Sequence, residues 1–162
     1  MIIHFFCRIA LGGENDIHTF PYLRPNSIIY RSDNDQYAHV NNSIYYHFFD
    51  SAVNTYLIRH CGLKPPTSLL IGLVVHSYCH FFSPVSFPVV LDLGLRVAKL
   101  GNSSVTYEIG VFEEGKDIPN AVGGYTHVFV DNATRKSTAM DSTTRSGLQK
   151  LYNSQDTPQP KL

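Results

Sequence analysis

The 162-residue sequence has no tryptophan, three cysteines and few charged residues, and these shortages exclude several classes of protein. Charged residues make up 16% of the chain and the formal net charge is zero, so the basic field used for nucleic-acid binding is missing. Cys7, Cys61 and Cys79 form neither a CxxC pair nor a metal-ligand spacing. We therefore expect no nucleic-acid partner, no metal site and no cofactor.

Long hydrophobic runs are missing as well. The apolar stretch at the N-terminus is interrupted by Arg8 and is much shorter than the ~20 residues that span a bilayer. We therefore expect no stable membrane insertion. The sparse, odd number of cysteines favours an intracellular, reducing compartment. The sequence leaves the compartment itself open: it would be the cytoplasm, or an organelle if the N-terminal stretch is a targeting segment.

Aromatic and aliphatic residues are plentiful, with ten Phe, ten Tyr and a hydrophobic content of 43%. This composition and length predict one domain with a largely aromatic core. We expect an N-terminal extension over residues 1–20, the domain over 21–152 and a flexible, polar tail over 153–162. Pro21 and Pro25 predict an irregular entry loop over residues 14–25.

A single long helix is predicted over residues 42–60. Two adjacent faces of it are apolar: Ile44, Phe48, Ala52 and Tyr56 on one, and Tyr45, Phe49, Val53 and Leu57 on the other. A helix that is apolar around most of its circumference is buried. Gly62 is the predicted residue after the helix cap, and Pro65-Pro66 prevents continuation.

Most of the remaining chain alternates between apolar and polar residues, as strands do. Strands are predicted at 27–30, 72–82, 90–99, 104–113 and 121–131. Their short connections predict an antiparallel sheet with one apolar face, which must curl around the long helix. A short C-terminal helix follows within residues 141–152, with Asp141 as its cap and Leu148 and Leu151 as its contacts. The predicted fold class is α+β.

The polar turn at residues 31–42 is the first candidate for chemistry. It places two carboxylates, Asp33 and Asp35, beside a helix start marked by Asn41 and Asn42. An Asn cap accepts hydrogen bonds from the first free N–H groups of a helix, and that end carries partial positive charge. Carboxylate chemistry and an anion-binding backbone therefore meet in one turn. The alternative interpretation is an Asx turn with a helix cap and no chemistry.

Several motifs resemble one family over roughly residues 21–132. They are Asp33-Asn-Asp35, His39-Val-Asn-Asn42, Tyr45, Phe87-Pro88, Leu95-Arg-Val97 and Leu100-Gly-Asn-Ser-Ser104. Together they resemble the 4-hydroxybenzoyl-CoA thioesterase-like branch of the hotdog fold. The resemblance implies an antiparallel sheet curled around one central helix, and a homodimer or homotetramer with active sites between subunits. Ala38 stands where that family commonly has Gly.

The resemblance also implies a reaction, the hydrolysis of an acyl-CoA or acyl-carrier-protein thioester to a free acid and a thiol. Asp35 maps to the catalytic carboxylate, which acts as nucleophile or general base. A backbone N–H, for which Gly72 is the candidate, polarises the carbonyl where negative charge develops. The implied substrate-binding residues in and after the turn are His39, Asn41, Asn42 and Tyr45. For His39, acid–base chemistry and orientation of the turn through a backbone hydrogen bond are both open.

A histidine-rich stretch lies on the predicted strand after the long helix. Alternation puts His76, Tyr78 and His80 on one face and Ser77 and Cys79 on the other. His76 and Tyr78 are candidates for substrate binding, although the same face suits a dimer seam or solvent.

Two other functions fit parts of the pattern. A non-catalytic module that binds acyl thioesters on the same fold is the main alternative, because Asp35 can bind without turnover. A hotdog hydratase is disfavoured, since such enzymes have a D-x-N-x-x-H arrangement and this chain has Asp35 and Ala38 at the Asn and His positions. The sequence leaves the acyl group and its carrier open.

Overall fold

The structure, a computed structural model, describes residues 7–10, 17–20, 22–65 and 67–152. Its elements in chain order are β1 (Cys7–Ala10), β2 (Ile17–Phe20), β3 (Tyr22–Ile28), α1 (Asn42–His60), β4 (Leu70–Phe81), β5 (Val90–Leu100), β6 (Ser104–Glu113), β7 (Ala121–Asp131) and α2 (Ser142–Gln149). The predicted tail at 153–162 lies outside the described residues, as do residues 1–6 and 11–16 of the predicted extension.

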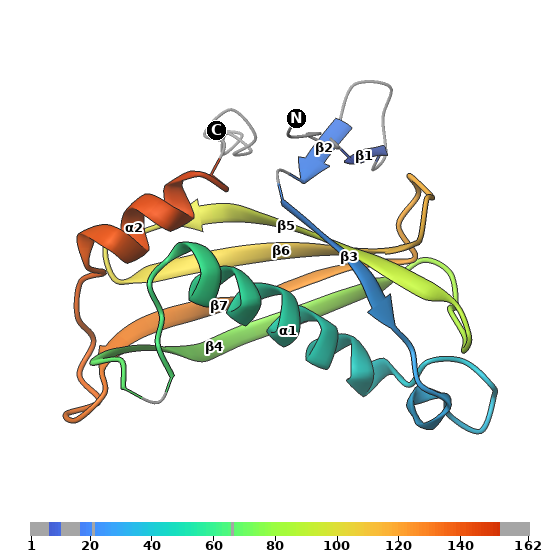
Figure 1. Cartoon of the computed structure of the whole chain (residues 1–162), viewed down its shortest axis with the longest axis horizontal. Coiled ribbons are helices and arrows are strands. Elements are labelled where there is room, and N and C mark those ends of the chain that lie inside the picture. Colours follow the sequence, from blue (N-terminus) through green and yellow to red (C-terminus); the bar gives the residue numbers. More distant parts are fainter. Residues whose placement is uncertain (1–6, 11–16, 21, 66, 153–162) are drawn as a thin grey trace, which may run out of the picture.

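Five strands form one antiparallel sheet in the order β3-β5-β6-β7-β4. Figure 1 shows α1 lying along one face of this sheet, with α2 at the end where α1 finishes. Five antiparallel strands wrapped on one long helix, followed by a short helix, are the architecture of the hotdog fold. The predicted α+β class and hotdog fold are confirmed.

The ends of α1 are fixed by the residues that the sequence suggested. The Asn41 side chain accepts a hydrogen bond from the Ser43 N–H at 3.0 Å and caps the start. At the other end Gly62 adopts a φ of 73°, and the Leu63 N–H returns to the Leu57 carbonyl at 3.1 Å. No helix in the described part of the chain is both long and apolar enough to cross a bilayer.

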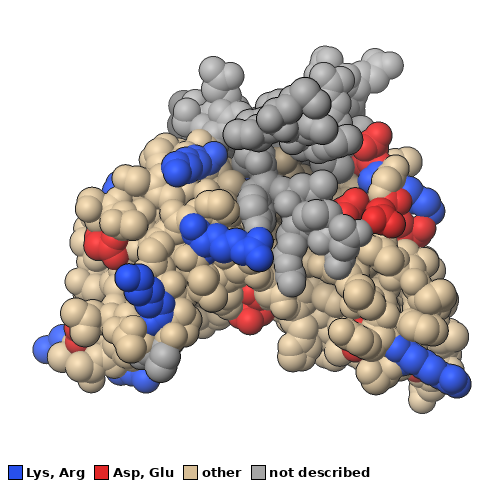
Figure 2. Space-filling view, viewed as in Figure 1, with Lys and Arg blue, Asp and Glu red and all other residues tan. Residues whose placement is uncertain are grey.

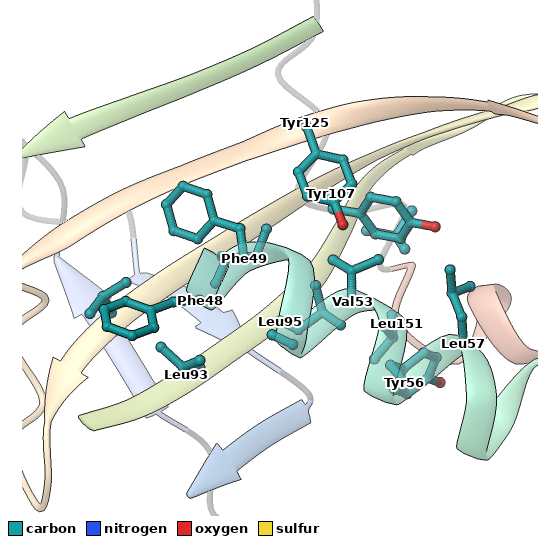
Figure 3. Packing of buried hydrophobic residues seen from close by; sticks show 14 of the residues in the cluster. Phe48, Phe49, Val53, Tyr56, Leu57, Leu93, Leu95, Tyr107, Tyr125 and Leu151 are labelled. Atoms are coloured by element: carbon teal, nitrogen blue, oxygen red, sulfur yellow. The ribbon is translucent and has the colours of Figure 1, made fainter. Parts of the chain in front are cut away.

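The core lies between α1 and the sheet. Seven α1 side chains are buried there: Tyr45, Phe48, Phe49, Ala52, Val53, Tyr56 and Leu57. Figure 3 shows Phe49 and Val53 directed at the sheet, with Leu93, Leu95 and Tyr107 among their neighbours. A Cβ on Gly123 would lie 2.6 Å from the Phe49 ring, so β7 approaches the helix closely only because residue 123 has no side chain.

The C-terminal helix closes the end of the core. Asp141 caps it by accepting a hydrogen bond from the Thr144 N–H at 2.8 Å. Leu148 and Leu151 are buried, as predicted, and the Tyr56 hydroxyl donates to the Gly147 carbonyl at 2.8 Å. This contact ties α2 to α1, because Tyr56 lies on the central helix.

The predicted entry loop over residues 14–25 is wrong, because strands β2 and β3 occupy most of the described part of it. Pro25 is compatible with β3 since β3 is an edge strand and its register with β5 shifts between Arg24 and Ser27. Phe20 at the end of β2 is fully buried against Phe112 and Val122. The last residue of the predicted extension therefore packs on the domain.

Candidate active site

The turn before α1 holds the Asp35 carboxylate in a fixed position. One oxygen, Oδ1, accepts hydrogen bonds from the backbone N–H groups of Tyr37 at 2.8 Å and His39 at 3.3 Å. The Asp35 N–H donates to the His39 carbonyl at 2.7 Å, and the Ala38 N–H donates to the Asp35 carbonyl at 3.1 Å. Within the described part of the chain, the other oxygen, Oδ2, accepts no hydrogen bond. The half-buried carboxylate is thus held by one oxygen and free at the other.

Asp33 has a structural part in the same turn. Its carboxylate accepts the Tyr30 N–H at 2.8 Å, and its carbonyl accepts the Asn41 N–H at 2.8 Å. Asn34 bridges the turn, because its side chain donates to the Ala38 carbonyl at 3.0 Å and accepts from the Phe87 N–H at 3.2 Å. The two carboxylates of the motif therefore differ in position: Asp33 accepts an N–H from the residue before the turn, whereas Asp35 accepts two N–H groups from within it.

The loop after β4 supports this turn from outside. The Val40 N–H donates to the Val85 carbonyl at 2.8 Å, and the Ser86 hydroxyl donates to the Ala38 carbonyl at 2.7 Å. Tyr45, on the first turn of α1, packs edge-on against Phe81 at 5.0 Å between ring centroids. These contacts place Asp35 at the C-terminal end of β4.

Ala38 adopts a left-handed backbone conformation, with φ at 63°. The left-handed conformation is higher in energy for a residue with a Cβ than for glycine, which explains why a Gly is common at this position of the motif. We predict that Ala38→Gly raises the free energy of unfolding by roughly 0.5–1 kcal/mol, since part of the relieved strain is offset by glycine entropy in the unfolded chain. Urea denaturation measures this change. Ala38→Val is the matched variant, and a gain in stability from valine would contradict the strain argument.

The other residues predicted in the turn have distinct positions. The Asn41 side chain is committed to the helix cap, and Asn42 is the exposed first residue of α1. The His39 ring is exposed, while its backbone supplies two of the hydrogen bonds around Asp35. Tyr45 is buried, and desolvation raises the pKa of its hydroxyl to about 12. Their contacts with a substrate stay predictions.

A cavity of about 870 Å³ lies at the opposite end of α1 from Asp35. Its walls come from the C-terminal half of α1, residues 62–72, the end of β7 and residues 138–144. Gly72 lines it, together with Asn54, Leu57, His127 and Phe129. Asp35 does not line it, because the 19-residue α1, about 28 Å long at the usual rise, separates the two. One chain therefore does not bring Asp35 and Gly72 together.

The Gly72 N–H points out of the free edge of the sheet. Gly72 lies opposite Phe129 in the β4–β7 pair, and the Phe129 N–H donates to Ser103 on the far side, at 2.7 Å. Two residues directly opposite each other in an antiparallel pair either both point their N–H and C=O groups toward each other or both point them away. The Gly72 N–H is therefore directed away from β7, at the open edge of β4, where a carbonyl oxygen can approach it.

His127 lies behind Gly72 in the cavity wall, and sequence reasoning missed it. A Cβ on Gly72 would lie 2.6 Å from His127 Nδ1, so the imidazole fills the space that a side chain at residue 72 would need. His127 is 4% exposed, and desolvation lowers its pKa to about 4. The one signal in the sequence was a histidine at a position of β7 that otherwise alternates as an apolar, core-facing residue. This signal is weak, because a strand with an exposed face shows alternating polar residues too.

The depressed pKa of His127 predicts acid sensitivity of the fold. Above about pH 6.5 the imidazole is neutral in both states. As the pH falls from there to about 4, the unfolded chain binds a proton that the native state excludes, so the free energy of unfolding decreases. The loss is of the order of 3 kcal/mol at 1.36 kcal/mol per pKa unit. Urea unfolding of wild type and His127→Phe across this range measures it. Equal pH dependence of the two proteins would contradict the assignment.

His76 and Tyr78 lie on the face of the sheet that points away from α1. They pair with Thr126 and Gly124 on β7, which alternate with the helix-facing Gly123 and Tyr125. The Tyr78 hydroxyl reaches across Gly124 to Glu108 at 3.4 Å, and Glu108 pairs with Arg96 at 2.8 Å. The structure does not bring this row to Asp35 or to the cavity, so a role in substrate binding stays a prediction. Among the described residues, no group of His, Cys, Asp and Glu side chains is arranged to hold a metal ion.

Comparison with known proteins identifies the class to which this fold and turn belong. The thioesterase superfamily matches residues 37–119, which include the second half of the turn after Asp35, then α1 and the strands β4, β5 and β6. The chain belongs to the thioesterase superfamily.

Solved structures share the fold of this chain. The PA5185 protein from Pseudomonas aeruginosa is 46% identical over 83% of this chain and 94% of its own, with a TM-score of 0.81. Slr0204 from Synechocystis, a 1,4-dihydroxy-2-naphthoyl-CoA thioesterase, is 16% identical over 80% of this chain and 95% of its own, with a TM-score of 0.69. YbaW from Escherichia coli is 21% identical over 80% and 97%, with a TM-score of 0.68. The last two show likeness of fold alone. The comparison with curated proteins gave no match.

Proposed function

We propose that this protein hydrolyses an acyl thioester of CoA or of an acyl carrier protein, with Asp35 as the catalytic carboxylate. The observation that carries the proposal is the Asp35 side chain, which two backbone N–H groups hold by Oδ1 while Oδ2 stays available. A carboxylate fixed in this way needs no reorganisation before it reacts. Membership of the thioesterase superfamily supports the reaction type.

Two routes use the same geometry. As a general base, Asp35 takes a proton from water while the water oxygen attacks the thioester carbonyl carbon; the C–S bond then breaks and the thiolate leaves with a proton. As a nucleophile, Asp35 itself attacks, the thiolate leaves, and water hydrolyses the resulting anhydride. Both routes place negative charge on the carbonyl oxygen. The outward-pointing Gly72 N–H is the proposed donor to that oxygen.

The proposed site needs two copies of the chain. Gly72 and Phe81 are nine residues apart on β4, about 30 Å of extended strand, and Asp35 lies beyond the Phe81 end. Antiparallel pairing of two β4 strands about their middle would place the Gly72 end of one copy beside the Asp35 turn of the other. We therefore propose a homodimer, with tetramers as a further possibility, in which each site combines Asp35 of one chain with the cavity of its partner.

The surface charge supports a phosphate-bearing carrier. Lys64 lines the cavity. Figure 2 shows mostly Lys and Arg side chains, with Asp and Glu side chains between them, over the end of the molecule that holds α2 and the C-terminal half of α1, while the opposite upper side carries mostly Asp and Glu with Lys and Arg beside them. A carrier with phosphate groups, such as CoA, would be attracted to the cationic end.

Thiol release tests the proposal. Purified protein is incubated with a panel of aliphatic and aromatic acyl-CoA compounds and an acyl carrier protein thioester, and a thiol reagent records free thiol. We expect hydrolysis of at least one member. Binding without thiol release from any member would instead favour the non-catalytic acyl-thioester module.

A further inference from the structure

Three polar side-chain atoms of the described core are buried without a hydrogen-bond partner and lie in one cluster. They are the hydroxyls of Tyr107 and Tyr125 and the Nδ1 atom of His127. The distance between ring centroids is 5.5 Å for the two tyrosines, 5.4 Å for Tyr107 and His127, and 4.8 Å for Tyr125 and His127. Figure 3 shows both tyrosines between the sheet and α1, beside Val53. We refer to these three residues as the polar core cluster.

Such a cluster is unusual in an apolar core. Buried polar groups are nearly always hydrogen-bonded, and an orphan atom points to a partner outside the protein. Each member of the polar core cluster is at most 4% exposed. Phe49, Val53 and Phe129 form the apolar surroundings. A group that supplies hydrogen bonds to this cluster would therefore be recognised with little competition from solvent.

The cluster opens to the outside through one of its members. His127 lines the 870 Å³ cavity, and the other two side chains lie behind it. Gly72, the proposed carbonyl donor, lies directly against the imidazole. A substrate whose thioester carbonyl meets the Gly72 N–H would thus pass His127 with the first few atoms of its acyl group.

We propose that His127 recognises a hydroxyl group on the acyl chain, within the first few carbons after the thioester carbonyl. This inference rests on the proposed thioester hydrolysis and deepens it to a substrate class, the 3-hydroxyacyl thioesters. His127 is a specificity-determining residue in this proposal, and Tyr107 and Tyr125 hold its ring in place.

The chemistry of the cluster selects a neutral, two-way hydrogen-bonding group. A hydroxyl both donates and accepts, as do a neutral imidazole and a phenol. Burial keeps all three members neutral at pH 7, since it lowers the pKa of His127 and raises those of Tyr107 and Tyr125. Among the described residues, Lys64 is the one Lys or Arg that lines the cavity, and the cluster itself has no cation to neutralise a carboxylate. An uncharged oxygen substituent therefore fits better than an acidic one.

Paired substrates test the proposal. We compare 3-hydroxyoctanoyl-CoA, octanoyl-CoA and 8-hydroxyoctanoyl-CoA as substrates of wild type and of His127→Phe, which keeps a ring and removes the polar atoms. Wild type is expected to prefer the 3-hydroxy compound about tenfold in kcat/KM over octanoyl-CoA, because a site built for a hydroxyl rejects the analogue that lacks it. His127→Phe should bring this ratio to about one. His127→Gln, which retains a donor and an acceptor, should keep part of it.

Phe129→Leu is the matched control, because it alters the same cavity wall without removing a polar atom and should keep the ratio. A preference that survives in His127→Phe, no preference in wild type, or a preference for the 8-hydroxy compound would overturn the proposal. Hydrolysis of octanoyl-CoA by wild type reports separately on the proposed function. If no compound is hydrolysed, calorimetry measures the Kd of each of the three compounds. The preference for the 3-hydroxy compound is then a ratio of Kd values, compared between Asp35→Asn and Asp35→Asn combined with His127→Phe.

Discussion

Asp35→Asn is expected to reduce hydrolysis by at least ~10²-fold, the scale of losing a general base. The amide keeps an oxygen that can accept the N–H groups of Tyr37 and His39, so the turn stays closed. What disappears is the basic, nucleophilic oxygen at Oδ2. The melting temperature is therefore expected to change little. Steady-state kinetics on the best substrate of the panel, together with thermal unfolding, measure both effects.

Asp33→Asn is the matched control for this prediction. It is the same substitution two residues earlier, at a carboxylate that accepts the Tyr30 N–H. We expect that variant to keep turnover within a few-fold of wild type, because an amide oxygen can accept the same bond. Near-normal turnover of Asp35→Asn would refute the catalytic assignment of Asp35. An equal loss of turnover in Asp33→Asn would show that activity depends on the shape of the turn and not on the Asp35 carboxylate in particular.

The elements that local patterns determine were predicted well. The helix over 42–60 was bounded by an Asn cap and by Gly62, and both act as expected because capping depends on neighbouring residues only. The alternating runs gave β5, β6 and β7 within one residue of their observed ends. Prolines misled the prediction for β3, since their effect depends on whether a strand is an edge, which is a property of the whole sheet.

The candidate site was predicted only where it is local. The Asp35 turn closes on itself within a few residues, so its motif was sufficient. Alternation placed His76 and Tyr78 on a common face, as observed, but which face meets α1 depends on long-range pairing with β7. The cavity and the polar core cluster gather residues from α1, β6 and β7, and no local pattern connects them.

A homodimer is the second result that we expect, and its loss should abolish activity. β4 is a twelve-residue edge strand without a Lys, Arg, Asp, Glu or Pro, and residues 73–77 are exposed, with Val74 at 52% and Val75 at 61%. Natural proteins protect such an edge by charge, by proline or by covering it. Two-fold pairing of the exposed stretch would form one continuous sheet and bury these valines.

Charge on this edge should separate the subunits. We expect Val74→Asp combined with Val75→Asp to sediment as a monomer and to lose turnover, because Asp35 and Gly72 would no longer share a site. Ile118→Asp is the matched control, since Ile118 is 80% exposed in the β6–β7 loop and far along the chain from β4. Sedimentation or light scattering across dilution, run with activity, measures both. A wild-type monomer with full activity would refute edge pairing and the shared site together.

Mixing two inactive variants decides whether a site is shared. Asp35→Asn removes the carboxylate, and Gly72→Val blocks the carbonyl-binding position because a side chain there meets His127. In a shared-site dimer, each mixed dimer contains one site with both defects and one intact site. Random exchange of equal amounts makes half of the dimers mixed, so about one quarter of wild-type activity should return in a two-fold assembly. Sedimentation first confirms that each variant is a dimer on its own. If each site belonged to a single chain, the mixture would stay inactive, since every chain would carry one of the two defects.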